Sequence, residues 1–252
     1  MAKFKADLHI HTILSPCGDM EMSPANIIRV ASEKGLQIIG ITDHNSTLQA
    51  PLIRQLGQKA GITVLCGAEI TTREEIHCLA FFEEEAQLTL FQQYLEEHLP
   101  HIPNAPEKFG YQVVVDEEEN IVHEYPWLLI SGLDQSLDEV ALKVHNLNGL
   151  FIPAHVSRPK YSLISQLGFI PPDLEADALE ISRHTTREEL YSQFSYVSRW
   201  PIIQSSDAHF LSDIGMVYTI FEMEAPTFTE IRKALAGENN RCVTPSRSIT
   251  EL

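Results

Sequence analysis

Residues able to bind metal ions alternate with apolar ones near the start of this chain, in the string DLHIHT at residues 7–12. In a β-strand, residues two apart face the same way, so His9 and His11 would project together while their apolar neighbours are buried. Two imidazoles on one face of a strand form part of a metal site. Similar strings recur at residues 42–45, TDHN, and at residues 205–209, SSDAH.

The candidate ligands share a position, at or just beyond the C-terminal end of a predicted strand. In parallel α/β barrels that rim carries the active site. Imidazole nitrogen and carboxylate oxygen suit zinc, manganese or iron better than they suit a thiolate cluster. We expect Asp7 and Asp43 to orient neighbouring imidazoles by hydrogen bonds. The candidate metal ligands at strand ends are His9, His11, His44, Glu69, His77, His155, Asp207 and His209.

The elements that must position these residues follow from periodicity and helix signals. Ser23 is the expected N-cap of the first helix and Gly35 its stop. The order strand, helix, strand, helix, strand over residues 6–70 implies a parallel sheet. Strands are predicted at 6–11, 37–42, 63–70, 76–82, 150–153, 178–181, 202–205 and 216–222, and helices at 24–34, 48–60, 85–97, 136–147 and 227–236.

Residues 100–135 break this pattern with Pro-Asn-Ala-Pro, an acidic run at 116–119 and Tyr125-Pro126-Trp127. We interpret this stretch as an insertion or lid, because loops of that length are usually functional or disordered. A surface excursion without a catalytic role is the alternative. If the stretch is functional, it would contribute to substrate specificity.

Length and composition indicate one globular domain over residues 1–252. The chain is 44% hydrophobic and 21% charged, close to the average for soluble proteins. The 35 acidic residues outnumber the 18 Lys and Arg residues, a formal charge of −17, which opposes nonspecific binding to a polyanion. We therefore expect no duplex nucleic acid as a partner. Small phosphorylated molecules are still possible substrates, because three divalent ions bound at one site would cancel about six of the negative charges there.

The chain starts in a strand pattern without the apolar stretch of a signal peptide, and no apolar run is long enough to span a membrane. We expect a cytoplasmic protein that does not bind membranes. The four cysteines lack paired zinc-finger or redox spacing, so reduced thiols are expected. The sequence indicates no oligomeric state.

The strings DLHIHT, TDHN, GAEI, HCLAFF, PAHV, LEIS and SSDAH occur in this order between residues 7 and 209. Together they resemble the successive motifs of the PHP family, named for polymerase and histidinol phosphatase domains. The resemblance implies a distorted (β/α)7 barrel holding two to three divalent ions, Zn, Mn or Fe. It also implies that Glu69 bridges two ions, one held with His9, His11 and Asp207 and the other with His77 and His155.

A third ion in the family would be held by His44, His209 and a ligand after the first motif. Related histidinol phosphatases carry a His-Gly pair there, whereas this chain has Cys17-Gly18 followed by Asp19. A thiolate suits zinc but is a poorer ligand for manganese or magnesium, and Asp19 can substitute for it. Either residue is a candidate third ligand.

Cationic residues follow two of the predicted strands and are candidates to bind a phosphate. Arg158 and Lys160 follow His155, and Arg183 and His184 follow the LEIS string. The planar fork of arginine matches phosphate oxygens, so Arg158 and Arg183 are the stronger candidates, with a surface ion pair as the alternative. Glu180 in LEIS either steadies a loop or acts directly.

These features predict a metal-dependent phosphoesterase. A hydroxide on the metal would attack phosphorus while an arginine neutralises the phosphate oxygens, and His184 or water would protonate the leaving alcohol. One alternative is a nuclease or 3'-5' exonuclease acting on short single-stranded nucleic acid. Another is a noncatalytic metal-binding interaction module that kept the barrel but lost turnover.

Overall fold

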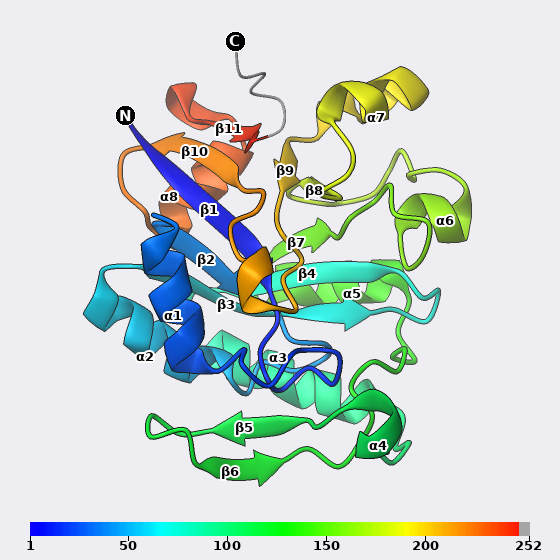
Figure 1. Ribbon diagram of the computed structural model, residues 1–252. Helices are drawn as coiled ribbons and strands as arrows, with labels where there is room; N and C mark the ends of the chain where they lie inside the picture. The colour runs from blue at the N-terminus through cyan, green and yellow to red at the C-terminus, as the bar shows by residue number, and fades with distance from the viewer. Residues whose placement is uncertain (247–252) are drawn as a thin grey trace.

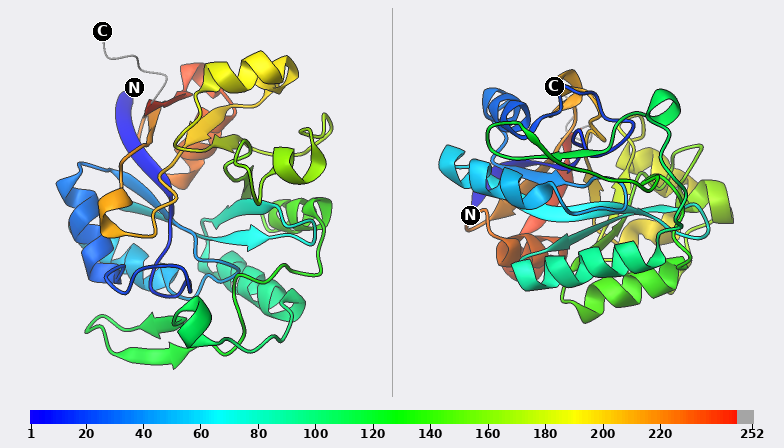
Figure 2. Two further views of the ribbon diagram at one scale, coloured as in Figure 1. Left: turned by 45° about the vertical axis from the view of Figure 1, so that its right-hand side comes forward. Right: turned by 90° about the horizontal axis from the view of Figure 1, so that it is seen from below.

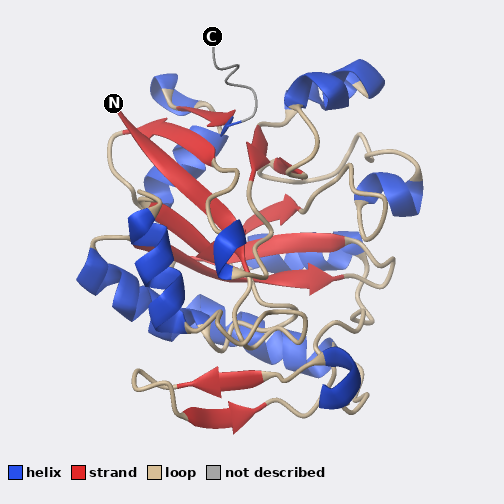
Figure 3. Ribbon diagram, viewed as in Figure 1, coloured by secondary structure: helices blue, strands red, loops and turns tan. Residues whose placement is uncertain are grey.

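The computed structural model describes residues 1–246, and a barrel of short, buried strands lies at its centre with helices around it (Figures 1 and 3). β1, β2 and β3 are parallel neighbours, as the alternation of strands and helices predicted. The barrel strands are β1 (Ala2–Ile10), β2 (Ile38–Ile41), β3 (Thr63–Thr71), β4 (His77–Phe82), β7 (Leu150–Pro153), β8 (Leu179–Ile181) and β9 (Ile202–Gln204).

Backbone hydrogen bonds outside the regular ladders close the barrel. β8 and β9 form a parallel pair. The Val156 N–H donates to the Glu180 carbonyl over 2.8 Å, which links β7 to β8, and the His11 N–H donates to the Ala208 carbonyl over 2.9 Å, which links the segment after β9 to β1. The ring order β1-β2-β3-β4-β7-β8-β9 confirms the predicted distorted (β/α)7 barrel.

Several strands run against the predicted parallel direction. β4 is antiparallel to both β3 and β7, because residues 72–76 are long enough for a hairpin but too short for a crossover. At the other edge β10 (Thr219–Met223) is antiparallel to β1, and β11 (Cys242–Pro245), which was not predicted, is antiparallel to β10. The parallel sheet predicted from residues 6–70 is confirmed for β1, β2 and β3, whereas the strands that join them on either side are antiparallel.

The five predicted helices are present with ends within two residues of the expected positions. They are α1 (Pro24–Glu33), α2 (Ala50–Ala60), α3 (Glu85–His98), α5 (Leu137–Asn146) and α8 (Phe228–Leu235). Ser23 precedes α1 as expected, but its hydroxyl donates to Glu119 rather than capping the helix. The shorter elements, too brief to show periodicity, are α4 (Pro106–Phe109), α6 (Leu163–Leu167), α7 (Arg187–Gln193), η1 (Ser195–Arg199), η2 (Leu211–Asp213) and η3 (Glu238–Asn240).

Within residues 1–246 no helix has the length and apolar character needed to cross a bilayer.

Two apolar layers pack against the strands. Leu8, Leu79 and Phe81 share one buried cluster with residues of α8, whereas Ile10 belongs to a second cluster with residues of α1 and α3. The pairing of β1 with β2 also shifts in register between Asp7 and Ile10, next to the metal-capable residues.

The insertion at residues 100–135 forms α4 and a hairpin of β5 (Val113–Val115) and β6 (Ile121–Glu124). It lies beside the loop that follows β1 (Figures 1 and 2): the Val113 N–H donates to the Ile13 carbonyl, and Gly110 packs against the Pro16 backbone. Asn45 adds a second attachment, its side-chain amide donating to the Leu129 and Ser131 carbonyls. The insertion therefore supports the site from outside.

Gly40 is the position in β2 where a side chain has no room. A Cβ there would lie 2.4 Å from the Leu8 carbonyl oxygen and 2.9 Å from the Leu8 Cα. We expect Gly40→Ala to push β1 away from β2 and to lower the free energy of unfolding by about 1–3 kcal/mol, the range for overpacked cores. Urea unfolding of the variant measures this, with exposed Ser32→Ala in α1 as control. Unchanged stability of Gly40→Ala would contradict the close approach.

Candidate metal centre

Glu69 of β3 lies at the centre of the candidate site, buried among five imidazoles. Backbone bonds to the loop after β2 hold it, since the Glu69 N–H donates to the Asp43 carbonyl over 3.0 Å and the Asn45 N–H donates to the Glu69 carbonyl over 2.8 Å. Both carboxylate oxygens face imidazole nitrogens. The distances are 2.8 Å from Oε1 to His77 Nδ1, 3.1 Å from Oε1 to His155 Nε2, 3.3 Å from Oε1 to His9 Nε2, 3.1 Å from Oε2 to His44 Nδ1 and 3.4 Å from Oε2 to His11 Nε2.

Asp207 is the second carboxylate of the cluster. Its Oδ1 lies 3.4 Å from Nε2 of both His9 and His11, and 3.5 Å from His209 Nδ1. The two Nε2 atoms of His9 and His11 are themselves 3.2 Å apart, so these side chains project together as predicted. The structure thus brings the eight candidates at strand ends into one cluster.

His77 reaches the cluster by a different route from the one expected. It begins β4 rather than ending a strand. Because β4 runs antiparallel to β3, its first residue lies at the rim where the other strands finish, and Thr71 at the end of β3 is its partner. The expectation that every candidate sits at the C-terminal end of a strand is wrong for His77.

Hydrogen bonds behind the imidazoles fix two ring orientations. The Asp43 carboxylate accepts from the Ser15 hydroxyl over 2.6 Å, and that oxygen lies 2.9 Å from His11 Nδ1. Glu180 Oε2 lies 3.0 Å from His9 Nδ1 and accepts the His155 N–H over 3.0 Å. With each Nδ1 engaged, the Nε2 atoms of His9 and His11 face the cluster.

Asp7 does not contact an imidazole, contrary to expectation. Its carboxylate accepts the backbone N–H and the hydroxyl of Ser206, at 2.9 and 2.6 Å, and the Gly215 N–H at 2.8 Å. Burial raises its pKa to about 6 even though these hydrogen bonds oppose the rise. Asp7 therefore anchors the loop that presents Asp207 and His209, and the partner that reveals this role is 199 residues away in sequence.

The electrostatics of the cluster match what divalent ions need from their ligands. Burial would raise the pKa of Glu69, but His77, His9 and His44 hold it well below its usual range, and His9 and His11 do the same for Asp207. Burial lowers the pKa of His44 and of His77, and lowers that of His209 to about 4 with help from His11. Ionised carboxylates and neutral imidazoles are the ligand forms that bind metal. At His9 and His11 the neighbouring carboxylates outweigh burial, raising the pKa of His9 well above its usual range and that of His11 to about 8, so a bound ion would displace a proton from these two rings.

Buried polar atoms without a hydrogen-bond partner also point to a missing ligand. Four of them lie in this region, namely His44 Nδ1, His155 Nδ1, Glu180 Oε1 and Asp207 Oδ1. His44 Nδ1 lies 3.1 Å from a Glu69 oxygen and Asp207 Oδ1 lies 3.4–3.5 Å from imidazole nitrogens, but neither atom is aligned for a hydrogen bond. Leaving such atoms unsatisfied in an apolar interior costs free energy, which a bound cation would offset for the acceptors. The donor set, all nitrogen and oxygen, fits zinc, manganese or iron.

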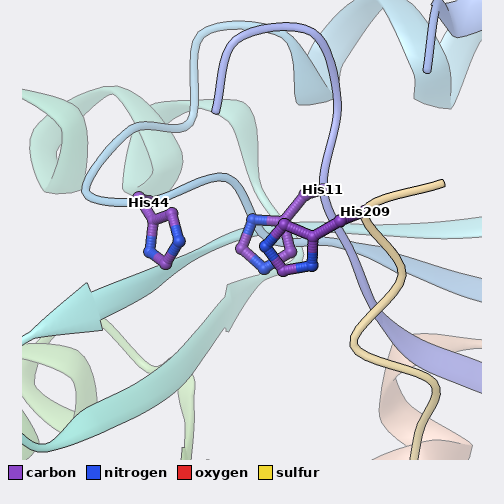
Figure 4. A group of neighbouring side chains, drawn as sticks. All are labelled: His11, His44 and His209. Atoms are coloured by element: carbon purple, nitrogen blue, oxygen red, sulfur yellow. The ribbon is translucent and has the colours of Figure 1, made fainter. Parts of the chain in front are cut away.

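Three overlapping groups of ligand atoms lie within 4.8 Å of one another: His9, His11 and Glu69; His44, Glu69 and His77; and His11, His44 and His209. In the last group the rings of His11 and His209 stack with centroids 4.1 Å apart and His44 lies beside them (Figure 4). Among the described residues neither Cys17 nor Asp19 joins such a group. Their role as a third ligand therefore stays a prediction.

Cys17 and Asp19 differ in their relation to the site. Cys17 lines the cleft above Asp207 and His209, and desolvation together with the Glu69 carboxylate raises the pKa of its thiol to about 12. The thiol therefore stays protonated at neutral pH. Asp19 accepts the Glu21 N–H over 2.8 Å and does not line the cleft.

A cleft of about 630 Å³ opens above Asp207 and His209. Arg158, Arg183 and His184 all line it, as predicted for phosphate binders. Arg158 donates to Asp207 Oδ2 over 2.6 Å, and Arg183 lies 3.5 Å from Asp213 and donates from Nε to His184 Nε2 over 3.4 Å. No residue of the insertion at 100–135 lines this cleft, so the idea that it acts as a lid or specificity loop has no support in the structure.

Tyr161 is a contact that the sequence did not reveal. Its ring stacks on His77 with centroids 4.9 Å apart, and its carbonyl accepts the His77 N–H over 3.0 Å. A tyrosine in a loop after several polar residues carries no local signal for such a contact. The contact between Ser15 and His11 likewise has no signal in the local sequence.

The sequence comparisons agree with this geometry. The family model of the PHP domain matches residues 7–159, and that of the PHP-associated region matches residues 195–239. The chain belongs to the PHP domain family. This membership agrees with the predicted enzyme class, a metal-dependent phosphoesterase.

Several proteins resemble this PHP domain over most or part of its length. The uncharacterized protein YqxK of Bacillus subtilis is 28% identical over 96% of this chain and 64% of its own length. The uncharacterized protein MJ1587 of Methanocaldococcus jannaschii is 40% identical over 28% of this chain and 46% of its own length. The chain thus spans less than two thirds of the length of these relatives.

Two solved structures share the fold. Endonuclease Q from Pyrococcus furiosus has a TM-score of 0.74 at 22% identity, covering 96% of this chain and 58% of its own. A Bifidobacterium adolescentis protein assigned as a metal-dependent phosphoesterase has a TM-score of 0.61 at 20% identity, covering 92% of this chain and 96% of its own. At these identities the likeness establishes the PHP barrel fold alone.

The metal-free protein should show two histidines that titrate far apart. Burial and His11 place the pKa of His209 at about 4, whereas hydrogen bonds to Asp207 and Glu69 outweigh burial and place that of His11 at about 8. The ordinary pKa of a histidine is 6.5. The contribution of His209 to the free energy of unfolding is therefore complete above pH 6.5 and is lost as the pH falls through 4. The His11 contribution is complete below pH 6.5 and is lost as pH rises through 8.

Nitrogen-15 NMR titration of the chelator-treated protein measures both values, with His209→Gln and His11→Gln to assign the signals. Two titrations that both centre near 6.5 would contradict this account of the cluster.

Proposed function

We propose that this protein hydrolyses phosphoesters of small phosphorylated metabolites or nucleotides with the help of two to three divalent ions. The observation that carries the proposal is a pair of carboxylates, the buried Glu69 and the partly exposed Asp207, facing imidazole nitrogens beneath a cleft lined by two arginines. Family membership and the phosphoesterase of the same fold support it.

The residues that would hold the ions are those that already converge. Glu69 would bridge two positions, one with His9, His11 and Asp207 and the other with His77 and His155. His44 and His209 would hold a third, and the stacking of His11 on His209 makes His11 a candidate beside Cys17 and Asp19. Zinc, manganese or iron bound there would supply Lewis acidity that activates water and neutralises phosphate charge.

The cleft residues would bind and orient the substrate. Arg158 and Arg183 present guanidinium groups to phosphate oxygens, which they match in geometry and charge. Each already faces a carboxylate, Asp207 or Asp213, so a phosphate would share or replace that partner. His184 lies on the same wall and is the proposed proton donor to the leaving oxygen, with water as the alternative.

Nucleic acid has to be reconsidered as a partner. The net charge of −17 argued against duplex binding, but endonuclease Q, which shares the fold, forms a complex with a 27-mer duplex that has an abasic lesion at the active site. This weakens the expectation that duplex nucleic acid is excluded. Among the residues lining the described cleft, Arg158 and Arg183 are the permanent cations, which favours a substrate with few phosphates.

The proposal is tested by removing the bridging carboxylate without changing its shape. Glu69→Gln should lose bound metal and should lower kcat/KM by more than about 100-fold, since even residues that only orient metal ligands can cost that much. Metal analysis and hydrolysis of p-nitrophenyl phosphate and its bis-ester, with added manganese, zinc or iron, measure both effects. Glu222→Gln, a surface residue paired with Lys3, is the matched control.

Loss of metal together with activity supports the proposal, whereas full activity in Glu69→Gln or in metal-free wild type would overturn it. A wild-type protein that binds metal but hydrolyses no phosphoester in a screen of phosphorylated metabolites would instead favour the noncatalytic interaction module. Such a module would bind the ions without catalysing a reaction.

Arg183 provides a separate test of phosphate binding. Arg183→Ala should keep its bound metal and lower kcat/KM by about 10–100-fold, the equivalent of one charged hydrogen-bonded contact. Arg187→Ala, whose guanidinium pairs with Glu188 outside the cleft, is the control. Loss of metal in Arg183→Ala, or a rate equal to that of the control, would exclude a direct phosphate contact.

A further inference from the structure

The organic part of a substrate must lie against the walls of the cleft above the metal donors. Those walls come from residues 155–159, 180–185 and 205–213. At about 630 Å³ the cleft is in the range of pockets that enclose a whole small-molecule ligand, and is far larger than one phosphate needs. The residues that select the substrate are therefore in these three segments.

Phe210 is the large aromatic side chain on these walls. It directly follows His209, lines the cleft and is 53% exposed. No aromatic ring in the described part of the chain pairs with it. The position of the exposed ring beside the candidate reaction centre offers a face on which an apolar, planar group can stack and be removed from water.

The backbone around Phe210 holds this ring in place. The Phe210 carbonyl accepts the Asp213 N–H over 2.9 Å and starts the short turn η2. Asp7 fixes both ends of the segment through Ser206 and Gly215. In Figure 1 the segment is the orange loop with one short helical turn near the centre of the view. The ring is thus presented by an anchored loop.

A cation stands beside the same turn. Asp213, which ends η2, lies 3.5 Å from an Arg183 guanidinium nitrogen, so the turn that carries Phe210 also positions Arg183. An aromatic platform combined with arginines is the arrangement that proteins use to bind a nucleotide, the base stacking on the ring and the phosphate meeting the cation.

Three hydroxyl groups that line the cleft are hydrogen-bonded to one another. The hydroxyls of Ser157 and Ser182 are hydrogen-bonded to Thr185 Oγ1, at 3.0 and 3.1 Å. Hydroxyl groups that satisfy one another are poorly available to the hydroxyls of a sugar phosphate. Sugar hydroxyls therefore gain little binding here, and the apolar ring of Phe210 is the lining group suited to a planar base.

We infer that Phe210 stacks on the nucleobase of the substrate and makes this protein selective for nucleotide phosphoesters. The inference rests on the proposed function, because it assigns a substrate class to the same site. It predicts that kcat/KM falls by the same factor when the base is removed from the substrate and when the Phe210 ring is removed from the protein. Making both changes together should lower kcat/KM no further than either one alone.

Two matched substrate pairs test this inference. One is dAMP against deoxyribose 5-phosphate, and the other is the dinucleotide d(ApA) against the same diester with one abasic nucleoside. Phe210→Ala should lower kcat/KM for the base-bearing member of each pair by about 5–100-fold, the effect of losing one base–aromatic stack. Its kcat/KM for the member that lacks the base should stay within about twofold of the wild-type value. Phe210→Trp should retain or improve use of the base-bearing member.

Phe169→Ala is the matched control, since Phe169 is 49% exposed but does not line the cleft. Equal losses for both members of a pair in Phe210→Ala, or no loss for either, would overturn the inference while leaving the proposed function intact. Metal content of Phe210→Ala should equal that of wild type, which separates loss of stacking from damage to the neighbouring His209.

A wild-type protein that hydrolyses none of the four substrates with manganese, zinc or iron would speak against the proposed function for these esters. Calorimetric binding of dAMP and of deoxyribose 5-phosphate then decides the stacking without turnover. Tighter binding of dAMP that Phe210→Ala abolishes supports the inference. Absent dAMP binding, or equal affinity for the two ligands, overturns it.

Discussion

The charge of one buried carboxylate governs the organisation of this protein. Glu69 lies at 1% exposure, where loss of hydration opposes ionisation, and five imidazoles at 2.8–3.4 Å surround its two oxygens. A carboxylate in such a position is stable only while those partners are present. They come from the end of β1, the loop after β2, the start of β4 and the segment after β7, so the electrostatic balance at Glu69 depends on how these strands are brought together.

Closure of the ring requires unusual backbone at the points where the site residues emerge. His155 and Asp207 have φ angles of +31° and +53°, a region that costs a residue with a side chain of order 1–3 kcal/mol. Hydrogen bonds that compensate lie next to each. Glu180 accepts the His155 N–H, and Asp7 accepts from Ser206 beside Asp207. Buried carboxylates outside the metal cluster thus hold the strained segments that carry it.

The floor and the walls of the site have different structural support. The floor is set by barrel strands and by hydrogen bonds among buried groups, such as Asp43 to Ser15 to His11. The walls are loops after β7, β8 and β9, whereas the insertion after α3 is attached to the loops after β1 and β2. This division lets the reaction centre stay constant while wall residues such as Phe210 and Arg183 determine what enters.

Local pattern by itself determined the residue chemistry and most of the elements. Alternation and helix caps placed β1 to β3 and the five longer helices, and the order of the metal-capable motifs indicated the family, because these signals lie within a few residues of one another. Pattern identifies which face of an element is apolar, but it does not name the neighbouring strand or its direction.

Only tertiary structure decided the contacts between distant segments. The antiparallel course of β4 brought His77 to the rim, Asp7 found its partners 199 and 208 residues away, and His11 rather than Cys17 or Asp19 came within ligand distance of His44 and His209. The insertion turned away from the cleft for the same reason. Such pairings depend on how the barrel closes, which is a property of all its strands together and is not encoded in any one local stretch.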